Sequence, residues 1–131
     1  MRSTQGSLFM ILSLSWLGTV CGAEHTKEPL DKVRQQVESG QAVLIDVREK
    51  SEWEAGHLRD AQLLPLSQLR QGLPAEELRR RLPKDKPIYL HCQAGVRCLK
   101  AAEILEKAGI ATRPLSAGYP ELLRAGFAPA Q

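Results

Sequence analysis

Residues 89–98 read YLHCQAGVRC, and this stretch indicates both the fold of the chain and the position of its reactive residue. An apolar run ends abruptly at Cys92, a tight loop closes on Arg97, and apolar residues then recur at helical spacing from Leu99 to Leu105. The pattern predicts a strand, a loop and a helix, with Cys92 at the bottom of a cradle of backbone N–H groups. Aligned amides and the helix dipole stabilise negative charge, so we expect a depressed pKa and a reactive thiolate at Cys92.

Strand-like and helical stretches alternate on both sides of this loop. Continuous apolar runs at 42–45 and 88–90 are typical of strands buried on both faces. Weaker patterns predict short strands at 63–64 and 112–115, helices at 30–37, 74–82, 98–108 and 121–124, and a single helical turn within the charged loop 49–57. This alternation predicts an α/β fold with a central parallel sheet covered by helices on both faces.

Polar side chains appear where the two predicted central strands end. Asp46 and Arg48 follow the first strand, and Cys92 follows the second. The carboxyl ends of parallel strands meet at one edge of the sheet, where sites of such folds usually form. We therefore expect Asp46, Arg48 and Cys92 to converge on one rim, although they lie far apart in the sequence.

The composition is that of an ordinary globular domain. The chain has 131 residues, 43% of them apolar and 25% charged, which is enough for one domain to bury a core without disulfide bonds. A net charge of +3 with only two Trp, two Tyr and two Phe leaves little for stacking on bases, so we expect no nucleic-acid partner. The His and Cys residues lack the spacing of a metal site, and we expect neither a metal nor a cofactor.

The start of the chain has the pattern of a targeting segment. Arg2 gives a positive start, residues 8–20 are mostly apolar, and small residues at 21–23 suit a cleavage site after Ala23. We expect three parts, namely a signal peptide, a loose polar linker and one domain, over residues 1–23, 24–29 and 30–131.

Cleavage would place the mature protein in the periplasm or otherwise outside the cell, as a monomer without stable membrane association. Three alternatives stay open for this segment. It is retained as a membrane anchor, it is an unrelated apolar tail, or Cys21 is modified with lipid, although residues 18–20 fit a lipoprotein site poorly. In the secreted form Cys92 and Cys98 are the two remaining cysteines, in an oxidising compartment.

Two motifs carry a resemblance to a known family. In the first, four residues separate Cys92 from Arg97, with Gly95 among them. The second lies upstream at the matching spacing and comprises Asp46-Val47-Arg48, Glu52-Trp53, Gly56-His57-Leu58 and Ala61. With these motifs the chain resembles the single-domain rhodaneses, which are sulfurtransferases, over residues 30–126. The resemblance implies a rhodanese-like fold for the domain.

The activity implied by this resemblance is that of a thiosulfate sulfurtransferase. The Cys92 thiolate would take a sulfane sulfur from thiosulfate or a similar donor, hold it as a persulfide, and pass it to cyanide or a thiol. The substrate and the persulfide would be held by the loop residues Gln93, Ala94, Gly95, Val96, Arg97 and Cys98. Related phosphatases and arsenate reductases have five residues between Cys and Arg, so the four-residue loop here disfavours a tetrahedral oxyanion.

Three residues are expected to support the loop without reacting. Asp46 and Arg48 would shape the rim and pair electrostatically, and His57 would brace a neighbouring loop. Arg97 has two possible roles, because it either orients the donor or ties the loop to Asp46 or Glu52.

Cys98 departs from the family pattern, in which this position is commonly serine or another small residue. It is either a small side chain at the helix start or a resolving thiol that attacks the Cys92 persulfide. Two further functions therefore stay open: a thiol-redox protein with Cys92 and Cys98 as a reversible disulfide pair, and a sulfur carrier with little turnover. His91 precedes the nucleophile but points to the other face of the strand, so we expect it to be buried and hydrogen-bonded.

Overall fold

Strands and helices alternate along residues 22–131, the part of the chain that the computed structural model describes. The elements in order are α1 (Leu30–Glu38), β1 (Val43–Asp46), α2 (Lys50–Ala55), β2 (Ala61–Leu63), α3 (Leu66–Gln71), α4 (Ala75–Arg81), β3 (Ile88–His91), α5 (Arg97–Lys107), β4 (Arg113–Pro114) and α6 (Tyr119–Arg124). All but the last two residues of the predicted signal peptide lie outside the described residues.

The strands form one parallel sheet in the order β2-β1-β3-β4. The two apolar runs become the central strands β1 and β3, and their register places Asp46 beside His91. Because every strand points the same way, the carboxyl ends share one edge of the sheet. The predicted α/β fold with a central parallel sheet is confirmed.

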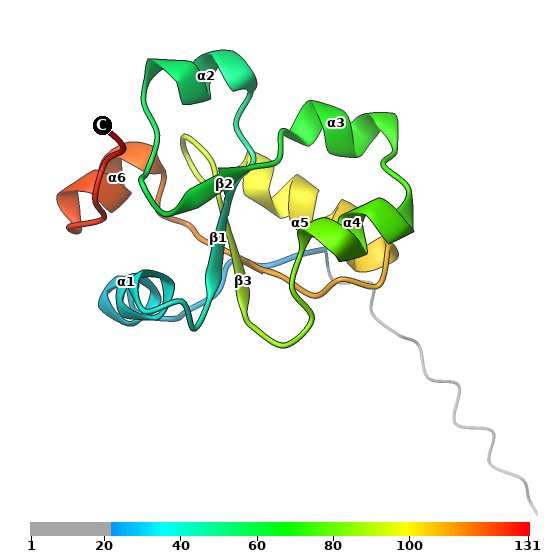
Figure 1. Ribbon diagram of the computed structural model, residues 1–131, viewed down its shortest axis with the longest axis horizontal. Coiled ribbons are helices and arrows are strands. Elements are labelled where there is room, and N and C mark those ends of the chain that lie inside the picture. Colours follow the sequence, from blue (N-terminus) through cyan, green and yellow to red (C-terminus); the bar gives the residue numbers. More distant parts are fainter. Residues whose placement is uncertain (1–21) are drawn as a thin grey trace, which may run out of the picture.

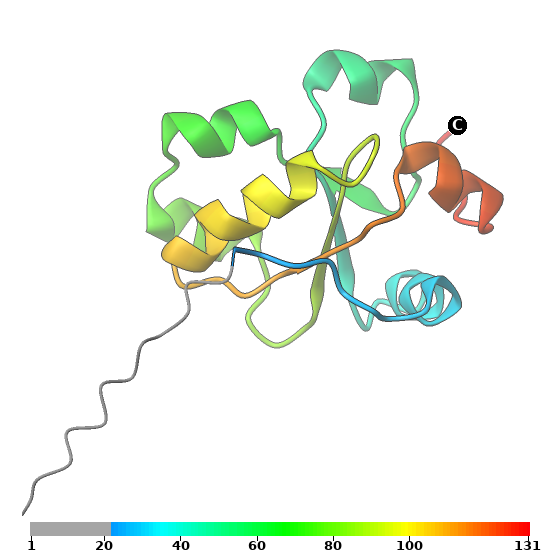
Figure 2. The same ribbon diagram turned by 180° about the vertical axis from the view of Figure 1, so that it is seen from behind.

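Helices cover both faces of this sheet (Figures 1 and 2). On one face, α3, α4 and α5 pack against alternate residues of β1 and β3, in a core that includes Ile45, Leu69, Leu78, Leu90 and Leu105. On the other face, α1 and α6 pack against the intervening residues, in a second core that includes Val33, Leu44, Tyr89, Leu115 and Leu122. Successive strand residues point to opposite faces, so a strand that is apolar throughout contributes to both cores.

Four elements differ from the sequence-based expectations. The strand β2 covers Ala61–Leu63, earlier than the expected 63–64. The helix α3 was not expected, because its six residues contain only two buried leucines. Pro65 before it and Gly72 after it are its only local signals. The helix α2 is longer than the single turn expected, since Glu49 caps it through a reciprocal capping box with Glu52. The strand β4 is shorter than expected, and its ladder partner is β3.

The segment 24–29, predicted to be a loose linker, is attached to the domain at two points. The Thr26 amide donates to the carbonyl oxygen of Pro114 at 2.8 Å, so the segment continues alongside β4. His25 lies 2.6 Å from the carbonyl oxygen of Gly95 through its Nε2 atom. Among residues 22–131, no helix has the length and apolar character needed to span a bilayer.

Candidate active site

Cys92 stands immediately after β3, at the shared carboxyl edge of the sheet. Figure 1 shows α2 above the loop that joins β3 to α5. The Cys92 side chain is buried, and the Gly95 amide donates a hydrogen bond to its sulfur at 3.1 Å. The loop therefore folds back over the sulfur, as the cradle predicted from the sequence requires.

The Cys92 sulfur lies in a set of hydrogen-bond donors that favour the thiolate. The Cys98 thiol has the largest effect, and the backbone N–H groups of Cys98, Ala94 and Gly95 add to it. Burial opposes them, but the net result lowers the pKa of Cys92 from 9.0 to about 5. Cys92 is therefore a thiolate at neutral pH, which is the nucleophilic form.

Cys98 stands at the start of α5, fully buried behind the loop. Its sulfur lies 3.2 Å from the carbonyl oxygens of both Gly95 and Leu115, and the Cys92 sulfur is a third acceptor for its proton. The hydrogen bond to Cys92 has the largest effect on Cys98, and together with burial and the negative charge of Cys92 it holds the pKa of Cys98 well above its usual range. The two cysteines are free and adjacent in the fold, one as a thiolate and the other as a neutral donor.

Two glycines allow the loop to approach the segment before α6. Gly95 has a φ of +84°, and a Cβ there would lie 2.5 Å from the carbonyl oxygen of Ser116. A Cβ on Gly118 would overlap the carbonyl oxygen of Gln93. The Tyr119 amide then donates to the carbonyl oxygen of Cys92 at 2.9 Å. Residues far downstream of the loop thus form its floor.

Asp46 and Arg48 form a buried ion pair at the end of β1. Arg48 donates through Nη2 and Nε to Asp46 Oδ2, at 2.8 and 3.0 Å, and the pair is almost fully enclosed. The remaining contacts of Arg48 extend to the carbonyl oxygen of Gly56, at 2.8 Å, and to Gln93 Oε1, at 3.4 Å. Its guanidinium also stacks over the Tyr119 ring, 4.2 Å from the centroid. The pair supports the reactive loop from the side of β1.

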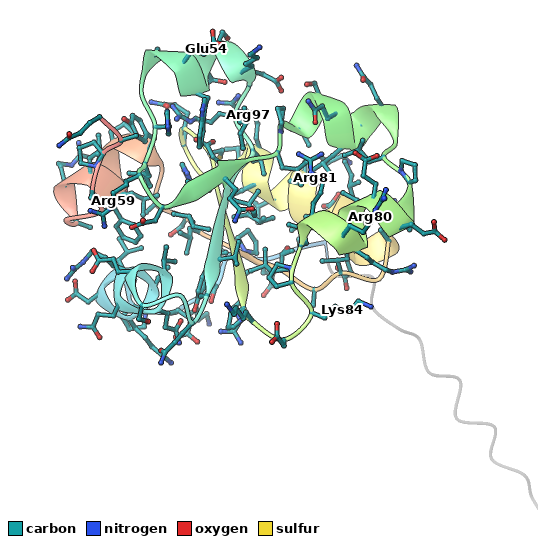
Figure 3. The ribbon with its side chains drawn as sticks, in the orientation of Figure 1. Glu54, Arg59, Arg80, Arg81, Lys84 and Arg97 are labelled. Carbon is teal, nitrogen blue, oxygen red and sulfur yellow. The ribbon has the colours of Figure 1, made fainter. Side chains whose placement is uncertain are left out.

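Arg97 joins the loop to α2 through Glu52. Its two terminal nitrogens bind the two carboxylate oxygens, at 2.5 and 2.8 Å. The sequence offered Asp46 or Glu52 as the partner of Arg97. In the structure Arg97 binds Glu52, and Asp46 binds Arg48. The guanidinium lowers the pKa of Glu52 from 4.5 to about 2, so the pair is ionised. Figure 3 shows Arg97 below α2.

Neither His57 nor His91 forms a hydrogen bond with the Cys92 sulfur. His57 donates a hydrogen bond from Nδ1 to the carbonyl oxygen of Trp53, at 2.9 Å, and its ring stacks on the Trp53 ring with 3.6 Å between centroids. His91 is fully buried, with Nε2 3.6 Å from Asp46 Oδ2, and burial lowers its pKa. Within residues 22–131, no three His, Cys, Asp or Glu side chains gather as a metal-binding group.

Sequence reasoning placed the nucleophile and the loop but missed the residues that hold the loop from a distance. Ser116, Gly118 and Tyr119 form the floor of the loop, and the motif Ala-Gly-Tyr only marks a turn in the sequence. His25 is separated from Gly95 by 70 positions, and no local pattern around it signals the contact. The expected roles of the loop residues in substrate binding stay predictions.

The comparisons with known proteins agree on one family. The sequence pattern described as the rhodanese-like domain matches residues 29–125. The "Uncharacterized protein YqhL" of Bacillus subtilis is 50% identical over 68 residues, which are 52% of this chain and 49% of that protein. The probable adenylyltransferase/sulfurtransferase MoeZ of Mycobacterium tuberculosis is 38% identical over 60% of this chain and 19% of its own length.

A solved structure, the human single-domain sulfurtransferase TSTD1, is similar over most of its length. It matches with a TM-score of 0.58 and 28% identity, over 72% of this chain and 92% of the human protein. The curated relatives described above are longer, and this chain spans about half of the first and a fifth of the second.

Proposed function

This chain belongs to the rhodanese-like domain family, and from that premise we propose that it is a sulfurtransferase that works through a persulfide on Cys92. The observation that carries the proposal is the Cys92 thiolate at the base of a loop of N–H donors. A preformed thiolate needs no general base, and no carboxylate or imidazole contacts the Cys92 sulfur in the described residues. Relatives that carry the name sulfurtransferase support the same class of reaction.

The first half-reaction is a displacement at sulfur. The Cys92 thiolate attacks the outer sulfur of thiosulfate, and a new S–S bond forms as the bond to the sulfite group breaks. The electron pair of that bond leaves with sulfite, and Cys92 carries the terminal sulfur as a persulfide anion. The N–H groups that now stabilise the thiolate then face the persulfide, which has the same charge.

The second half-reaction returns the thiolate. A nucleophile such as cyanide or a thiol attacks the terminal sulfur, and the electron pair of the Cys92 persulfide bond returns to the Cys92 sulfur. The narrow four-residue loop favours this chemistry over phosphoryl transfer, because its N–H groups converge on one sulfur position. The Cys98 thiol would donate a hydrogen bond throughout, and its raised pKa keeps it protonated.

Intact-protein mass spectrometry tests this proposal. The reduced protein is measured before and after thiosulfate, beside the variants Cys92→Ser and Cys98→Ser. We expect a gain of one sulfur atom that requires Cys92 and persists in Cys98→Ser. Loss of two hydrogen atoms under mild oxidant, with no gain of sulfur, would instead identify a Cys92–Cys98 redox pair. A stable persulfide that no small acceptor removes would identify a sulfur carrier.

We also propose that the chain is exported, on the sequence pattern of residues 1–23 alone. Expression of the full chain in a bacterium, followed by fractionation and mass measurement, tests this. A periplasmic product that begins at Glu24 is the expected result. A product that keeps Met1 in the cytoplasm would contradict export, and one that partitions with membranes would indicate an anchor or a lipid.

A further inference from the structure

The charges around Cys92 bear on which sulfur donor the site accepts, if the proposed function holds. Three ionised groups of the loop and its supports are negative, namely Cys92, Asp46 and Glu52, and two are positive, Arg48 and Arg97. The set therefore carries one net negative charge before any donor arrives.

Neither arginine offers a free positive charge to a second anion. The Arg48 guanidinium is enclosed, with Asp46 on one edge and the Gly56 carbonyl and the Gln93 side chain on the rest. The two terminal nitrogens of Arg97 are both bound to the Glu52 carboxylate. Each guanidinium is thus neutralised by a carboxylate at hydrogen-bond distance.

The Cys92 thiolate is stabilised by neutral donors. Its main stabilising contacts are three backbone N–H groups and the Cys98 thiol. Arg97 also attracts the thiolate, but its guanidinium is bound to Glu52. These dipoles match one negative charge, which the thiolate and later the persulfide both carry. A further negative charge on the donor meets no additional cation.

The exposed side chains of the loop are also uncharged. They are Gln93, Ala94 and Val96, and Val96, at 72% exposed, is the one large hydrophobic side chain of residues 22–131 that is so open to solvent. The unpaired basic side chains lie elsewhere. Figure 3 shows Arg80 and Lys84 around α4, away from Arg97. A pocket at the amino end of β3 is lined by Arg79, Lys84 and Lys86, and also by Arg113, which is paired with Glu28.

We propose that the donor is a persulfide on an uncharged or cationic organic thiol, and that thiosulfate is disfavoured by its two negative charges. The Cys92 thiolate attacks the outer sulfur of the donor R–S–SH, and the donor's S–S bond breaks. Its electron pair leaves with the carrier sulfur, which takes up the proton of the transferred sulfur. The products are the Cys92 persulfide anion and the carrier thiol R–SH, so atoms and charge balance. Thiosulfate brings a dianion to a negative site, where repulsion at short range slows its approach.

A series of donors with one chemistry and different charges tests the proposal on the wild-type protein. The persulfides of cysteamine, mercaptoethanol and mercaptopropionate carry a cationic, a neutral and an anionic group. Rapid quenching and intact-protein mass give the rate constant for sulfur gain at Cys92. We expect the rate constants to fall in that order, by about tenfold from first to last at low salt.

Salt supplies a readout that is independent of intrinsic reactivity. Added salt screens repulsion between like charges, so the rate constant for thiosulfate should rise several-fold from about 0.02 to 0.3 M salt, while that for mercaptoethanol persulfide stays nearly constant. A thiosulfate rate constant that falls with salt would show attraction to a positive site and would overturn the proposal. A protein that gains sulfur from none of the four donors would overturn the proposed function as well.

A matched pair of loop variants changes the charge alone. Val96→Lys adds a cation at the exposed tip of the loop, and Val96→Gln adds a neutral polar side chain of similar length. The ratio of the thiosulfate rate constant to that for mercaptoethanol persulfide should be about fivefold higher in the lysine variant than in the glutamine variant. Equal ratios in the two variants would show that charge at the loop does not select the donor.

Discussion

Two arginine–carboxylate pairs hold the reactive loop, and they differ in their exposure to water. The Asp46 and Arg48 side chains are 0% and 3% exposed, whereas Glu52 and Arg97 are 32% and 34% exposed. Removing one partner of a buried pair leaves an unpaired charge away from water, while a half-exposed pair is screened. The first pair should therefore matter most for stability, and the second for the position of the loop.

The substitution Asp46→Asn should produce the largest effect. It leaves the buried Arg48 without a counter-charge, and we expect the free energy of unfolding to fall by about 3 kcal/mol. Urea denaturation followed by circular dichroism measures this. If Asp46→Asn destabilised the protein no more than a substitution in the Glu52–Arg97 pair, the expected difference in stability between the two pairs would be wrong.

The substitution Arg97→Lys keeps the positive charge but removes the two-pronged contact with Glu52. We expect the rate of sulfur gain at Cys92 to fall by about tenfold, because the loop loses the contact that positions its end. The free energy of unfolding should change by less than about 1 kcal/mol. A stability loss as large as that of Asp46→Asn, with the reaction rate unchanged, would reverse the assignment of roles.

The Cys98 thiol is a third support of the loop and is uncharged. Two variants of similar size test whether its hydrogen-bond donor lowers the pKa of Cys92. Cys98→Ala removes the donor, so the pKa of Cys92 should rise above its present value of about 5. Cys98→Ser keeps a donor and should leave that pKa nearly unchanged. The ultraviolet absorbance of the thiolate, titrated with pH, gives both values. A similar pKa in the two variants would show that the side-chain hydrogen bond does not govern the thiolate.

The smallest expected effect is the pH dependence that the half-exposed pair gives to stability. The pKa of Glu52 is about 2 in the folded protein, below its usual 4.5, so the pair stabilises the fold above the higher value. This contribution should be lost as the pH falls from about 4.5 towards 2, because the folded carboxyl then takes up a proton. The free energies of unfolding of the wild type and Glu52→Gln are measured across this range. They should differ by less than about 1 kcal/mol near neutral pH, and the difference should disappear at acid pH. A difference that grew on acidification would contradict the assigned pair.

The sequence predicted the parts of the molecule that depend on local pattern. The apolar runs that became β1 and β3 are strong signals, because a strand buried on both faces is apolar throughout. The same reasoning placed Asp46, Arg48 and Cys92 at one edge of the sheet. Both arginines were recognised, but the choice of Glu52 for Arg97 needed the position of α2 in space.

The missed features depend on contacts between distant segments. The helix α3 has too few residues to establish a helical period, so its flanking Pro65 and Gly72 were its only signals. The His25 side chain contacts the Gly95 carbonyl oxygen across 70 positions, and the loop closes onto Gly118 through backbone atoms, so neither contact follows from the local sequence pattern.

The closure of the loop by downstream and upstream segments has a consequence for the newly made chain. Cys92 is synthesised before Ser116, Gly118 and Tyr119, the residues that complete its surroundings. Until those residues are synthesised and in place, the loop has no floor, and the cysteine is an ordinary thiol with little thiolate at neutral pH. The architecture therefore delays the appearance of the nucleophile until the segment before α6 has been made and has packed against the loop.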